Sequence, residues 1–115
     1  AALCKMLERH QLAGGVIDGP LSFDSAINAD VARIKDPNSP VAGQANVLLV
    51  PNLETGDMLV KQLIFLASAD VASIVMGCRV PVILTDSTDS QRTRVASTAL
   101  AVLLAAAQDR LDPVH

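Results

Sequence analysis

The sequence contains no tryptophan and no tyrosine, and only two of its 115 residues are phenylalanine. Proteins that bind single-stranded nucleic acids stack the bases on aromatic side chains, which this chain almost lacks. The formal net charge is −3 and no run of basic residues is present, so the positive charge that attracts a phosphate backbone is missing as well. These absences argue against nucleic acid as a partner.

Cysteine and histidine are equally scarce. Cys4 and Cys78 form no C-x-x-C pair, and the histidines, His10 and His115, do not complete a zinc-binding spacing. We therefore expect no metal site, and two buried or unreactive thiols in a reducing compartment.

A long apolar run is absent too. The longest weakly polar stretch, residues 95–107, is shorter than the about 20 residues that cross a bilayer. No charged segment followed by an apolar segment and a cleavage site marks a signal peptide. We expect a soluble, cytoplasmic protein without membrane contact. Because residues 1–9 have a helical composition but neither an initiator methionine nor a cap, we also expect a piece of a longer protein.

The chain does contain regular aliphatic patterns, since half of its residues are hydrophobic. Helical spacing predicts helices over residues 22–34 and 55–69, and helical composition predicts helices over residues 1–9 and 90–110. Short apolar runs predict strands over residues 16–18, 47–50, 72–76 and 80–85, the last two joined as a hairpin. This alternation predicts an α/β domain with a mixed, mostly parallel sheet and a C-terminal helix. Ligands of such sheets bind where strands end and helices begin.

The turn at residues 85–94 is the first candidate site, because hydroxyl groups and two arginines surround the start of the last helix. Free amides, hydroxyls and guanidinium groups together suit a phosphate. An ordinary structural explanation is open as well: Ser87, Thr88 or Ser90 caps the helix, and Asp86 and Asp89 neutralise Arg92 and Arg94.

Two further turns are less specific. Residues 51–57 open a helix with Lys61 one turn inside, and Gly56 permits close approach of a ligand; a capped helix with an exposed lysine fits equally. Asp18 and Asp24, beside a Gly-Pro turn, have the chemistry of acid or base groups, although surface carboxylates at such a turn are ordinary.

Three segments have the appearance of motifs. Residues 18–27 read DGPLSFDSAI, residues 39–43 SPVAG, and residues 49–61 LVPNLETGDMLVK. In this order they resemble the segments DGPLxxDxAI, SPVAG and LVPxLExGNxxxK of the phosphate acetyltransferase and phosphate butyryltransferase family. Gly77 and residues 81–85 resemble the segment that leads to the family's SRADS. The resemblance covers nearly the whole chain, and it is strongest to the C-terminal transferase part that is sometimes fused to an enoyl-CoA hydratase-like domain.

The resemblance implies an enzyme that exchanges an acyl group between coenzyme A and phosphate, with acyl-CoA and phosphate as partners and no metal or redox cofactor. It implies a two-domain fold similar to isocitrate and isopropylmalate dehydrogenases, of which residues 1–89 form part of one α/β domain. Residues 90–115 are then a C-terminal helix that packs on the other domain or on a partner chain, and we expect a homodimer. Residues 90–110 offer scarcely any polar face, and a helix that is apolar on all sides is normally buried on all sides. Packing on the other domain or on a partner chain would explain this composition.

Most of the site residues follow from the same resemblance. Asp89 takes the acidic place of SRADS and is the candidate base or thiol-orienting group, and Gly56, Lys61, Thr85 and Ser90 match the family's phosphate and substrate contacts. The turn at residues 85–94 adds Ser87 and Arg92 as further candidate contacts.

Three positions depart from the family pattern: Asp57 replaces its asparagine, and Asp86 and Ser87 replace its serine and arginine. All three changes make the site more negative, which opposes phosphate binding unless Arg92 and Arg94 compensate. An inactive homologue that serves as a structural or dimerisation domain is therefore an alternative. A dehydrogenase relative is a weaker alternative, because no cluster of metal-binding aspartates is present.

Overall fold

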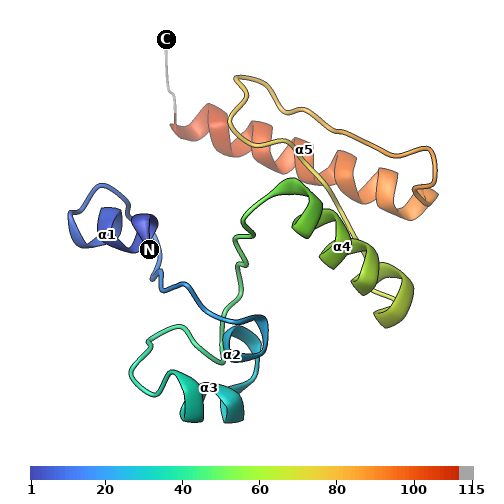
Figure 1. The fold of residues 1–115 in the computed structure, drawn as a ribbon. Helices are drawn as coiled ribbons and strands as arrows, with labels where there is room; N and C mark the ends of the chain where they lie inside the picture. Colours follow the sequence, from blue (N-terminus) through green and yellow to red (C-terminus); the bar gives the residue numbers. More distant parts are fainter. Residues whose placement is uncertain (112–115) are drawn as a thin grey trace. The chain divides into compact units, whose positions relative to one another are not determined.

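The computed structural model describes residues 1–111, and the chain divides into two compact units, Ala1–Val50 and Pro51–His115. Helices of the described residues are α1 (Ala2–Glu8), α2 (Phe23–Ile27), α3 (Ala29–Lys35), α4 (Leu53–Ala67) and α5 (Gln91–Leu111) (Figure 1). None of these helices combines the length and the apolar character that a membrane crossing requires. The prediction that residues 112–115 belong to the C-terminal helix lies outside the described residues.

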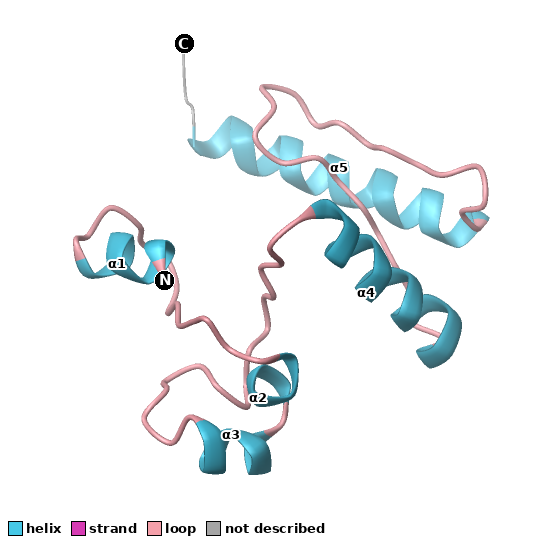
Figure 2. Cartoon of the chain, viewed as in Figure 1, coloured by secondary structure: helices cyan, strands magenta, loops and turns pink. Residues whose placement is uncertain are grey.

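The predicted strands are not formed within residues 1–111, which Figure 2 shows as helices joined by loops. One antiparallel bridge joins Val75 to Val82, with the Val75 N–H donating to the Val82 carbonyl at 2.9 Å. This bridge lies where the hairpin was predicted. A strand is stable only beside neighbours that complete its hydrogen bonds, and the described residues provide this single pairing. The α/β class and the dehydrogenase-like fold therefore stay predictions.

The single helix predicted over residues 22–34 is wrong, because the chain leaves the helical conformation at Asn28 (φ −111°, ψ 115°). The Asn28 side chain accepts hydrogen bonds from the Asp30 N–H at 2.9 Å and the Val31 N–H at 3.2 Å. Asparagine is a strong N-cap residue because its side chain satisfies these free amides. It therefore ends α2 and begins α3 within one apolar repeat.

The start of α4 also differs from the prediction. The Asn52 side chain accepts a hydrogen bond from the Thr55 N–H at 2.9 Å, so the helix begins at Leu53 rather than at Thr55 or Gly56. At the other end, Ser68 adopts a left-handed conformation (φ 53°, ψ 35°) that terminates the helix.

In the first unit, the segments DGPLSFDSAI and SPVAG pack against each other. The Gly43 N–H donates to the Ser25 carbonyl at 2.8 Å, and the Ala45 N–H donates to the Ala26 carbonyl at 3.1 Å. Gly43 has φ +79°, and a Cβ atom added there would lie 2.7 Å from the Ala29 Cα atom. Glycine is therefore required by both the backbone conformation and the close approach of α3.

In the second unit, α5 lies beside the irregular segment that precedes it (Figure 1). The fully buried Ser97 hydroxyl accepts a hydrogen bond from the Ser73 N–H at 2.9 Å, and the Gln108 side chain donates to the Cys78 carbonyl at 3.4 Å. The helix is not buried all round: Val102 and Leu103 remain 64% and 67% exposed. Its predicted packing on another domain or a partner chain stays a prediction.

The two cysteines are free thiols. Cys78 is exposed, and the half-buried Cys4 lies 3.6 Å from the Gly19 carbonyl oxygen. Cys78 lies in the loop between the two bridged segments and is not buried, so for this thiol the expectation of a buried or unreactive group stays a prediction of low reactivity.

Candidate functional site

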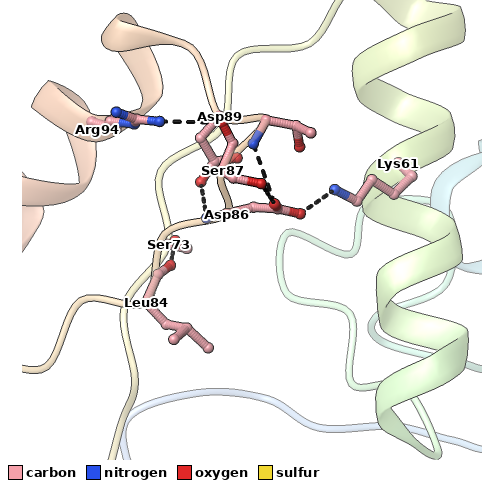
Figure 3. Close-up of polar contacts among 8 residues, drawn as sticks. Lys61, Ser73, Leu84, Asp86, Ser87, Asp89 and Arg94 are labelled. Carbon is pink, nitrogen blue, oxygen red and sulfur yellow. Dashed lines mark hydrogen bonds and ion pairs between the residues drawn. The ribbon is translucent and has the colours of Figure 1, made fainter.

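The candidate site lies in the second unit, where the loop before α5 faces α4. Lys61 is half-buried on α4, and its ammonium nitrogen lies 3.5 Å from Asp86 Oδ2 (Figure 3). The Asn52 cap begins α4 at Leu53, so that Lys61 lies within this helix. The structure thus brings one predicted phosphate ligand to the predicted site loop.

The loop is held in shape by its own hydrogen bonds. The Asp86 N–H donates to Asp89 Oδ2 at 2.7 Å, and the Asp89 N–H donates to the Asp86 carbonyl at 3.1 Å. The Ser87 hydroxyl and the Thr88 N–H both donate to Asp86 Oδ1, each at 3.2 Å. Side-chain oxygens of aspartate commonly satisfy backbone groups in such turns. Two predicted site residues, Lys61 and Ser87, therefore contact the Asp86 carboxylate, and a third, Asp89, is bonded to the Asp86 backbone.

Asp86 stays ionised in this arrangement. The hydrogen bond from the Thr88 N–H, followed by that of the Ser87 hydroxyl and the charge of Lys61, lowers the pKa of the Asp86 carboxyl below its ordinary value of 3.8. The small desolvation acts in the opposite direction and is outweighed. At neutral pH, Lys61 therefore faces a full negative charge.

Ser90 and Arg94 stabilise the start of α5. The Ser90 hydroxyl accepts a hydrogen bond from the Thr93 N–H at 3.1 Å, the geometry of a helix cap. Arg94 donates from its guanidinium group to the Ser87 carbonyl at 3.3 Å. The capping explanation that the sequence left open is thus correct for Ser90.

The other predicted phosphate contacts do not join this cluster. Arg92 forms an ion pair with Asp70 at 2.8 Å and lines an open hollow with Gln91, Val95 and Ala96. Among residues 1–111, Thr85 is exposed and makes no side-chain hydrogen bond, and the Gly56 N–H donates within its own helix to the Asn52 carbonyl at 3.2 Å.

The charge pairing differs from the one considered for this turn. Asp86 and Asp89 do not neutralise Arg92 and Arg94; Asp86 pairs with Lys61 instead. Nothing in the spacing of the sequence indicates this pair, because its members belong to segments brought together only by folding. Sequence reasoning identified both residues but not their contact.

Within the described residues, no three histidine, cysteine, aspartate or glutamate side chains form a group that could hold a metal ion. The carboxylates of the site loop are instead engaged with backbone amides and with Lys61.

The two aspartates of the first unit serve the local fold. Hydrogen bonds from the Ser39 hydroxyl and, at 2.8 Å, from the Gly19 N–H lower the pKa of Asp18. The Lys35 ammonium, 2.7 Å away, lowers the pKa of Asp24 to about 2. A carboxylate with such a low pKa is a weak base at neutral pH, so these contacts favour the ordinary explanation of both aspartates over an acid–base role.

Sequence comparisons agree with the motifs. A family model described as "Phosphate acetyl/butaryl transferase" matches residues 1–102. The phosphate acetyltransferase of Rhizobium meliloti is 60% identical over 106 residues, which are 92% of this chain and 34% of that protein. The phosphate acetyltransferase of Thermotoga maritima is 42% identical over 105 residues, 91% of this chain and 36% of that protein. A probable phosphate butyryltransferase of Bacillus subtilis is 42% identical over 102 residues, 89% of this chain and 34% of that protein.

The chain therefore spans about a third of the length of these relatives. The match nevertheless includes both motif-bearing units, from the α1 segment to the first half of α5. On this evidence, the chain belongs to the phosphate acetyltransferase and phosphate butyryltransferase family.

Proposed function

We propose that this chain is the C-terminal portion of a CoA-dependent phosphate acyltransferase, which converts an acyl-CoA and phosphate into an acyl phosphate and CoA. The observation that carries the proposal is the family match over residues 1–102, together with relatives that are named phosphate acetyltransferase and butyryltransferase. The arrangement of Lys61 against the loop before α5 supports it, because the ammonium group and the Ser87 hydroxyl both contact the Asp86 carboxylate in the loop that leads into this helix.

The reaction needs a base and an anion site. In one direction, the CoA thiolate attacks the carbonyl carbon of the acyl phosphate, the new carbon–sulfur bond forms, and phosphate leaves with the electrons of the carbon–oxygen bond. Asp89 is the candidate group that takes or orients the thiol proton. Its Oδ2 accepts the hydrogen bond from the Asp86 N–H, so its Oδ1 is the oxygen proposed to accept the thiol proton. Lys61, Ser87 and Ser90 supply positive charge and hydroxyl donors for the phosphate oxygens.

No redox cofactor is required by this proposal, because an acyl transfer between sulfur and oxygen leaves every oxidation state unchanged, and the family resemblance implies no metal. We further propose the two-domain α/β fold and the homodimer that the family resemblance implies, and the cytoplasmic location expected from the composition of the sequence. The exposed Val102 and Leu103 of α5 are compatible with a helix that is covered by another domain or by a partner chain.

The test is a graft. The matching segment of the Rhizobium meliloti phosphate acetyltransferase is replaced by this chain, since the two are 60% identical over 106 residues. We expect CoA release from acyl-CoA that depends on added inorganic phosphate, with the parent enzyme as the positive control. Circular dichroism checks that the graft is folded. A folded graft that releases no CoA in the presence of phosphate contradicts the proposal.

The alternative is a homologue that has lost the reaction and serves as a structural or dimerisation domain. A specific observation favours considering it: the two cations expected at the phosphate, Lys61 and Arg92, are each paired with a carboxylate. The inactive homologue predicts a graft that folds and dimerises like the parent enzyme but turns over no acyl-CoA. The same assay therefore separates the two functions.

A further inference from the structure

We propose that Asp86 is a specificity-determining residue: it holds Lys61 in the phosphate-free protein and competes with inorganic phosphate for the Lys61 ammonium group. The inference deepens the proposed function, on which it rests for the identity of the anion. It assigns a role to a residue that departs from the family pattern.

The first step of the argument is the contact itself. Asp86 Oδ2 lies 3.5 Å from the Lys61 ammonium nitrogen, so an anion that binds this nitrogen must share it with a carboxylate or displace the carboxylate (Figure 3). Both side chains remain partly accessible, with 38% of Lys61 and 51% of Asp86 exposed. Solvent screening weakens such a pair, and it can therefore be opened by a soluble anion.

The second step is that the carboxylate is held in place. Its other oxygen, Oδ1, accepts hydrogen bonds from the Ser87 hydroxyl and the Thr88 N–H. The backbone of Asp86 is bound to Asp89 in both directions, through its N–H and its carbonyl. The Asp86 side chain consequently loses no further conformational entropy when it pairs with Lys61. A phosphate ion, in contrast, loses translational and rotational entropy when it binds.

The third step is the local charge. The cluster holds two carboxylates, Asp86 and Asp89, against two cations, of which Lys61 is paired with Asp86 and the Arg94 guanidinium donates to the neutral Ser87 carbonyl and keeps its charge. A phosphate that enters meets a paired lysine and two negative groups. Exchanging Asp86 for a neutral residue removes both a competitor and a repulsive charge, so the affinity for phosphate should rise.

The variant that isolates the charge is Asp86→Asn, because its amide oxygen can still accept the hydrogen bonds from Ser87 and Thr88. Asp86→Glu retains the charge and is the conservative comparison. Asp86→Ser restores the residue type of the family motif. It shows whether an effect of Asp86→Asn comes from the lost charge or from the introduced amide group. Asp109→Asn on α5 makes the same change in net charge, and Asp109 belongs to none of the ion pairs among residues 1–111.

The primary measurement is the titration of the 115-residue chain with inorganic phosphate, followed by NMR of the Lys61 side-chain methylene. We expect the dissociation constant to fall about twofold to fivefold in Asp86→Asn and Asp86→Ser, the range of an exposed pair. It should stay unchanged in Asp86→Glu and Asp109→Asn. An equal dissociation constant in Asp86→Asn and the parent chain, or no effect of phosphate on Lys61 in either, overturns the inference.

A second measurement separates this inference from the proposed function. In the grafted transferase, Asp86→Asn should lower the KM for phosphate by a similar factor and leave the KM for acyl-CoA unchanged. An inactive graft whose chain nevertheless binds phosphate more tightly after Asp86→Asn contradicts the proposed function and supports the competition. An active graft with an unchanged KM for phosphate overturns the competition and supports the function.

Discussion

Ser97, fully buried in α5, accepts a hydrogen bond from the backbone N–H of Ser73 at 2.9 Å. Ser73 in turn donates its hydroxyl hydrogen to the Leu84 carbonyl at 3.0 Å. These two bonds attach the bridged segments before the site loop to the final helix. Within the second unit, a buried serine rather than a large aliphatic residue therefore joins α5 to the segment that contains Ser73.

Ser97→Ala should destabilise the second unit by about 1–3 kcal/mol, because the Ser73 N–H then loses its partner. Urea unfolding followed by circular dichroism measures the change, and hydrogen exchange at the Ser73 amide locates it. Thr98→Ala is the matched control: within the described part of the chain, the exposed Thr98 hydroxyl bonds only to the Arg94 carbonyl of its own helix, and we expect a change within about 0.5 kcal/mol. Unaltered exchange at Ser73 in Ser97→Ala would contradict the prediction.

Gly43→Ala should be the more damaging of two glycine substitutions. Gly43 (φ +79°) and Gly14 (φ +94°) both have left-handed backbones, but a Cβ atom meets Ala29 only at Gly43 and has open space at Gly14. Both variants bear the left-handed penalty of about 1–2 kcal/mol. Gly43→Ala adds about 1–3 kcal/mol of overpacking. Thermal unfolding of the two variants tests this difference, and equal losses would show that the contact with Ala29 is not restrictive.

Asn52→Ala should weaken α4 by about 0.5–2 kcal/mol, because it removes the acceptor of the Thr55 N–H. Backbone chemical shifts of residues 53–56 should lose helical character first, since the cap acts on the first turn. Asn46→Ala is a suitable control, as Asn46 is exposed and its side chain makes no hydrogen bond within residues 1–111. A first turn that stays helical in Asn52→Ala would show that packing, not the cap, defines the helix start.

Acid should remove the contribution of Asp24 to the stability of the first unit. The Lys35 ammonium lowers the pKa of the folded-state carboxyl from 3.8 to about 2, so the stabilisation is present above pH 4 and is lost as the pH falls towards 2. NMR titration of the Asp24 carboxyl carbon should give this midpoint, and Lys35→Gln should raise it. Urea midpoints of the parent chain and Asp24→Asn should converge near pH 2; a constant difference would argue against this titration.

Ser87→Arg should raise the activity of the grafted transferase by at least about tenfold, because a guanidinium group restores the charge that the family motif has at this position and stabilises the transferring phosphate. Ser87→Lys should restore less, since it lacks the bidentate geometry. Thr88→Arg adds the same charge one residue along the loop and serves as the control. Initial rates at several phosphate concentrations test the order of the three variants, and an equal gain in Thr88→Arg would indicate a nonspecific charge effect.

Much of the helical structure was predictable from residue spacing and composition. Composition predicted α1 and α5, and the aliphatic repeat predicted α4, each to within a few residues of its bounds, and the collinear motifs predicted the family. Both kinds of information are local, because a helix bonds each residue to one four positions away. The break at Asn28 also depends on a local feature, the capping side chain of asparagine. The prediction missed it because the aliphatic repeat continues through this position without interruption.

Only the tertiary structure decided which charges and hydrogen bonds meet. Lys61 pairs with Asp86, Arg92 with Asp70, and the Ser73 amide with Ser97. In every case the partners come from different segments, and their distance depends on how the chain folds back on itself rather than on their spacing. By itself, the amino-acid order determined the helices, the family and the identities of the candidate site residues. Folding decided that the lysine among them faces a carboxylate, because electrostatic energy depends on distance through space.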